Sequence, residues 1–139
     1  MIQRIQTIYF ILAILCMVLG NIFPVYINID ATTKIANLFK LHNQIVLLIL
    51  SVIIIGCIGY ALVLYKNRRF QLTITGITMA LTLLLNILIA VSYLPMAKEY
   101  DVHIQIAAFF PLVALLCLLL AVRAIRKDEH LVRSADRLR

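Results

Sequence analysis

Charge is what this sequence has least of. Only 14% of its 139 residues are Asp, Glu, Lys or Arg, whereas 64% are hydrophobic and the mean hydropathy is +1.04. Soluble domains are about 45–50% apolar and about 25% charged. A soluble domain of this size buries only about 68–70% of its unfolded surface, which would leave a large apolar area in water. The composition therefore argues against a soluble domain and predicts a single membrane domain.

The sequence also lacks the residue patterns of common enzyme classes. It has no H-E-x-x-H zinc motif, no G-x-S-x-G nucleophile motif and no glycine-rich phosphate loop, and only four glycines in all. The cysteines fall in separate apolar runs without C-x-x-C spacing, which is typical of small buried hydrophobic residues; they are Cys16, Cys57 and Cys117. We expect no catalytic residue, no cofactor and no metal site.

Four long apolar runs contain no charged residue in their interiors. They cover residues 5–25, 44–65, 70–94 and 104–125. Each reaches the roughly 20 residues that a helix needs to cross about 30 Å of hydrocarbon, where backbone groups must be satisfied internally. We predict an all-α membrane protein, a four-transmembrane-helix antiparallel bundle over residues 1–125. The lack of an ionisable residue deep in any run argues against a pump or an ion-coupled transporter.

The basic residues are divided unevenly between the two sides of this predicted bundle. Ten lie on one side: Arg4, Lys66, Arg68, Arg69, Arg123, Arg126, Lys127, Arg133, Arg137 and Arg139. Three lie on the other: Lys34, Lys40 and Lys98. Cytoplasmic loops carry an excess of Lys and Arg, so both termini are predicted to be cytoplasmic. Because these charges follow loops and ends, the net charge of +7 does not indicate nucleic-acid binding.

The loops differ in what they predict. Residues 25–30 alternate apolar and polar side chains, which predicts a short strand that pairs with residues 37–41. The connection around residues 96–102 is too short for a folded domain. His42 and His103 begin the second and fourth runs on the outer side, where they could meet in a metal or proton site, although nothing in their spacing requires it.

A polar stripe runs along the third helix. Its members are Gln71, Thr75, Thr78, Thr82 and Asn86. Steps of four, three, four and four residues place all five on one helical face. Two interpretations stay open: the face lines a small hydrophilic path, or it packs against other helices, where such groups find partners or bond their own backbone.

Small residues and prolines mark positions in the other helices. Gly56 and Gly59 are three residues apart and are predicted to let a neighbouring helix approach closely. Pro24 and Pro111 are predicted to bend or end their helices locally.

The tail over residues 126–139 is basic and is predicted to continue the fourth helix as an amphipathic cytoplasmic extension. Three interpretations stay open. The extension lies on the anionic inner leaflet, docks on a partner, or ends in water. The candidate contact residues are Arg123, Arg126, Lys127, Arg133, Arg137 and Arg139.

Several segments fit one pattern: IQRIQTIY at residues 2–9, LYKNR at 64–68, FPL at 110–112, and RAIRKDE at 123–129 followed by LVRSADRLR at 131–139. With these segments the chain resembles a Bacteroidota family of small four-helix membrane proteins, a domain of unknown function. The resemblance implies a bacterial inner membrane but no activity, substrate or catalytic residue.

Without catalytic motifs, the polar face and the charged tail favour a non-catalytic interaction or assembly subunit of an inner-membrane complex. Its expected partners are the lipid bilayer and another membrane protein or a second copy of the chain. The alternative is an oligomeric channel or carrier for a small solute, which would use the face formed by Thr78, Thr82 and Asn86. Neither hypothesis identifies a small-molecule substrate.

Overall fold

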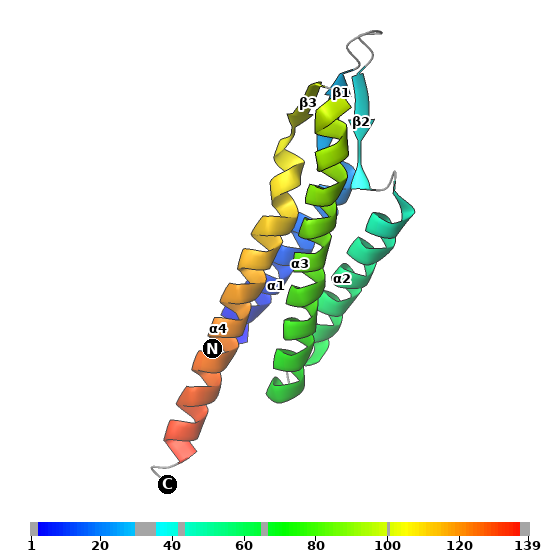
Figure 1. Ribbon diagram of the computed structural model, residues 1–139. Coiled ribbons are helices and arrows are strands. Elements are labelled where there is room, and N and C mark those ends of the chain that lie inside the picture. The colour runs from blue at the N-terminus through cyan, green and yellow to red at the C-terminus, as the bar shows by residue number, and fades with distance from the viewer. Residues whose placement is uncertain (1–2, 30–35, 42–43, 65–66, 100, 137–139) are drawn as a thin grey trace.

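The computed structural model describes residues 3–29, 36–41, 44–64, 67–99 and 101–136 (Figure 1). Within these residues the chain forms four helices that are long and apolar enough to cross a membrane. They are α1 (Gln3–Ile22), α2 (Ile45–Val63), α3 (Arg68–Glu99) and α4 (Phe110–Asp136). Successive helices run in opposite directions, so that one end of the bundle carries both termini and the other carries a small sheet (Figure 1). We call these the terminal end and the sheet end.

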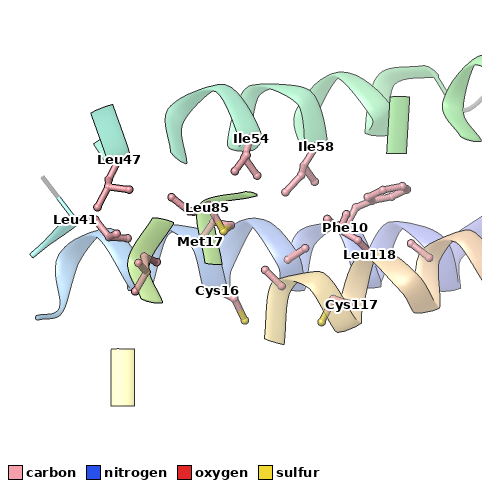
Figure 2. Close-up of a cluster of buried hydrophobic side chains, with 14 of the residues drawn as sticks. Phe10, Cys16, Met17, Leu41, Leu47, Ile54, Ile58, Leu85, Cys117 and Leu118 are labelled. Atoms are coloured by element: carbon pink, nitrogen blue, oxygen red, sulfur yellow. The ribbon is translucent and has the colours of Figure 1, made fainter. Parts of the chain in front are cut away.

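The helices pack around one apolar core. Helix α1 packs against α4 and α2, and α3 packs against α2 and α4. The largest buried apolar side chains come from all four helices and include Phe10, Met17, Ile54, Ile58, Leu85 and Leu118 (Figure 2). Large apolar side chains also cover the outer surface of each helix, where many are half exposed or more. An apolar interior with an apolar exterior is the pattern expected for helices surrounded by lipid.

The sheet end is closed by three antiparallel strands in the order β2-β1-β3. Strand β1 (Tyr26–Ile29) pairs with β2 (Ala36–Phe39) on one edge and with β3 (Asp101–Ile104) on the other. The predicted strand pair of the first outer loop is therefore confirmed. The third strand was not predicted, because it forms only when the folded bundle brings the two loops at the sheet end together.

Aromatic packing fixes the sheet to the helices. The rings of Tyr26 and Phe39 stack with centroids 4.2 Å apart, and Tyr93 of α3 meets Tyr26 edge-on at 6.0 Å. Offset and edge-to-face pairs of this kind add stability beyond the area that they bury. Tyr26 therefore joins β1, β2 and α3.

Two helix ends differ by five residues or more from the sequence prediction, and the other ends of the predicted spans differ by three residues or fewer, apart from the end of α4, where the helix continues into the predicted extension. Helix α3 continues to Glu99, past the predicted end at residue 94, and α4 begins at Phe110, after the predicted start at residue 104. Ile104 belongs to β3, and a 3₁₀ turn over Ile106–Phe109 leads into α4. Pro111 is the second residue of α4, a position where a missing amide hydrogen costs no helical bond.

The glycines of α2 do not mark a helix contact within the chain. A methyl group at Gly56 or Gly59 would meet none of the described atoms within 4 Å, so the predicted close approach at these positions is wrong for this bundle. The close approach is at Gly20 of α1 instead. There a methyl group would lie 3.4 Å from Cβ of Phe110 and 3.8 Å from Cδ of Pro111. The start of α4 therefore rests directly on the backbone of α1.

Candidate functional site

The polar stripe of α3 faces the interior of the bundle. Gln71, Thr75, Thr78 and Thr82 are buried, and Asn86 is half-buried. The structure therefore brings four of the five predicted residues into one buried seam, with Asn86 at its border. The seam lies among the chain's own helices.

The hydrogen bonds of this seam stay largely within α3. The hydroxyls of Thr75, Thr78 and Thr82 each donate to the carbonyl four residues earlier, at 2.7–2.8 Å. Asn86 continues the pattern, since Nδ2 donates to the carbonyl of Thr82 at 2.8 Å. A hydroxyl that donates a hydrogen bond to a carbonyl of its own helix needs no water and no neighbouring helix as a partner. The seam satisfies its polar groups as a packed helix face does.

Among the described residues, Gln71 makes the one side-chain bond of the seam that leaves α3. Its side-chain Nε2 donates to the carbonyl of Ala61 at 3.1 Å, in the last turn of α2. Carbonyls in the last turn of a helix have no partner within the helix. Gln71 therefore closes the hairpin between α2 and α3 at the terminal end.

These bonds predict that Thr78→Val is nearly neutral. Valine keeps the shape of threonine, and the lost hydroxyl bonds only its own backbone, so we expect the free energy of unfolding to change by less than about 1 kcal/mol. Gln71→Leu is the contrasting variant, because it leaves the carbonyl of Ala61 without its side-chain donor and should cost about 1 kcal/mol more than Thr78→Val. Denaturation by dodecyl sulfate measures both. A large loss with Thr78→Val would instead favour a hydrated path along the seam.

A second polar contact joins α1 to α2. The Ser51 hydroxyl lies 2.9 Å from Oδ1 of Asn21 and 2.8 Å from the carbonyl of Leu48, so its single proton is shared between them. Nδ2 of Asn21 donates to the carbonyl of Met17 at 2.9 Å. The sequence analysis did not single out this pair. Its signal is an amide and a hydroxyl within two apolar runs, near the same end of the bundle.

An ion pair at the terminal end fixes α4 to the start of α3. Nη2 of Arg68 lies 3.0 Å from Oδ2 of Asp128, and Nη1 donates to the Asp128 carbonyl at 3.4 Å. The side chain of Asp128 is only 9% exposed, whereas that of Arg68 is 28% exposed. The sequence analysis placed both residues at the same end but did not pair them.

Three basic residues near this contact are exposed. Arg123, Arg126 and Lys127 are exposed on α4. Arg133 lies on α4, where only the backbone is described, and Arg137 and Arg139 lie outside the described residues. Around Asp128, α4 thus buries one face and presents a basic face to its surroundings.

The remaining positions named in the sequence analysis are two histidines and three cysteines. His103 is exposed on β3, and His42 lies outside the described residues. Cys16 and Cys117 are buried and Cys57 is half-buried, all three as free thiols. Among the residues that the structure describes, no group of three His, Cys, Asp or Glu side chains could hold a metal ion.

Family comparison covers nearly the whole chain. Residues 2–138 match the family described as Domain of unknown function (DUF4293). The chain belongs to this family. No curated protein and no solved structure matches the chain. Membership of DUF4293 supplies no activity or ligand, so a functional proposal has to come from the geometry of the bundle.

Proposed function

We propose that this DUF4293 protein is a multi-pass inner-membrane protein of the Bacteroidota, with both termini in the cytoplasm. On this proposal it is a non-catalytic assembly subunit that binds an acidic surface of a membrane-protein partner. The distribution of Lys and Arg supports the orientation, since the sequence assigns ten of the thirteen basic residues to the side of the predicted bundle that carries the termini.

The observation that carries the assembly role is the continuation of α4 beyond its apolar part. The helix runs on from Ile125, which is buried in the bundle, to Asp136. Asp128 still contacts Arg68 at the start of α3, so the eight residues that follow it, at a rise of about 1.5 Å each, extend the helix roughly 12 Å beyond this contact. Its direction is fixed at Asp128 by the ion pair with Arg68. A partner therefore meets a basic face that is already positioned, which reduces the entropy lost on binding.

The chemistry of this face selects its partner. Arg123 and Arg126 carry guanidinium groups, which bind carboxylates through paired hydrogen bonds. An acidic cytoplasmic loop or helix of another membrane protein offers such groups. The same face is attracted to anionic lipid, which makes lipid binding the main competing outcome in any test.

The seam of α3 supports assembly over transport. A channel or carrier that used Thr78 and Thr82 would need these hydroxyls to face water. Both are buried within the bundle and bond their own helix. The alternative of an oligomeric channel therefore has no support from the position of these side chains.

The test compares two charge reversals at the terminal end, Arg126→Glu on α4 and Arg69→Glu at the start of α3. Both residues are exposed, and both variants replace Arg by Glu, so they change the net charge by the same amount. We expect Arg126→Glu to weaken retention of a stoichiometric partner, cross-linked in cells and purified in mild detergent, by about tenfold, because it places like charges against the partner. Arg69→Glu should leave retention unchanged.

Three results would contradict the proposal. One is the absence of a stoichiometric partner, and another is equal loss with both variants. The third is binding of the protein to anionic vesicles without binding of any protein partner. Orientation is checked separately with a membrane-impermeant maleimide on spheroplasts. Lys40→Cys should react in intact spheroplasts, and Lys127→Cys only after lysis.

A further inference from the structure

We draw no further inference here: the strongest candidate, the exposed face of α3 that carries Gly76, Ala80 and Leu83 opposite the polar seam, is a helix face of small and apolar residues, and nothing in the structure shows what covers it.

Discussion

Arg68→Ala should lower the free energy of unfolding by about 2 kcal/mol. Removing one member of a buried ion pair costs roughly 3–5 kcal/mol because the other charge is left without compensation, and we reduce this figure because the Arg68 side chain is 28% exposed. The remaining carboxylate of Asp128 is 9% exposed, so water reaches it poorly. Reversible denaturation in mixed micelles of dodecyl sulfate gives the measurement.

The double variant Arg68→Ala with Asp128→Ala is the control for this interpretation. It removes both charges, so it should be less destabilised than the sum of the two single variants, with a coupling of about 1 kcal/mol or more. Arg68→Lys keeps the charge but loses the second donor to the Asp128 carbonyl, and should fall between the wild type and Arg68→Ala. Additive single variants would show that the pair contributes no coupling in solution.

Gly20→Leu is expected to have the other large effect, a loss of about 3 kcal/mol. A Cβ atom at this position already lies 3.4 Å from the side chain of Phe110, so the further carbons of leucine have to push α4 away from α1. Overpacking of this kind costs about 1–3 kcal/mol, and more when backbone has to shift. The same denaturation assay measures the loss.

The matched control is Gly56→Leu on α2. There the new Cβ meets none of the described atoms within 4 Å, and leucine has a higher helix propensity than glycine by up to about 1 kcal/mol. Gly56→Leu should therefore leave stability unchanged or raise it slightly. Equal destabilisation by both variants would contradict the close contact between α1 and the start of α4.

The sequence predicted the helices well because the signal is local. A run of about 20 uncharged apolar residues forms a helix for reasons contained within the run, and each of the four runs coincides with one helix over most of its length. The ends were less predictable. Ile104 continues the apolar pattern of α4, yet it pairs with Tyr26 in the sheet, because hydrogen bonding between strands depends on a segment far away in the chain.

The candidate surfaces were predictable only in part. Spacing alone placed Gln71, Thr75, Thr78 and Thr82 on one face. It did not predict that the threonine hydroxyls donate to backbone carbonyls of their own helix. The pairing of Arg68 with Asp128 joins residues 60 positions apart, and the sequence of the basic tail gave no reason to single out the carboxylate of Asp128, which is buried, from the charges around it. The burial of the Tyr26 hydroxyl emerges only from tertiary packing.

The three-stranded sheet makes the two ends of the bundle unequal in stiffness. At the sheet end, β1 is hydrogen-bonded on both edges, so backbone ladders hold together the two loops of this end. At the terminal end, α3 and α4 are joined through the side chains of Arg68 and Asp128. A force applied to the extension of α4 therefore acts first on side-chain contacts at the terminal end, and we expect the ion pair between Arg68 and Asp128 to break before the hydrogen bonds of the sheet.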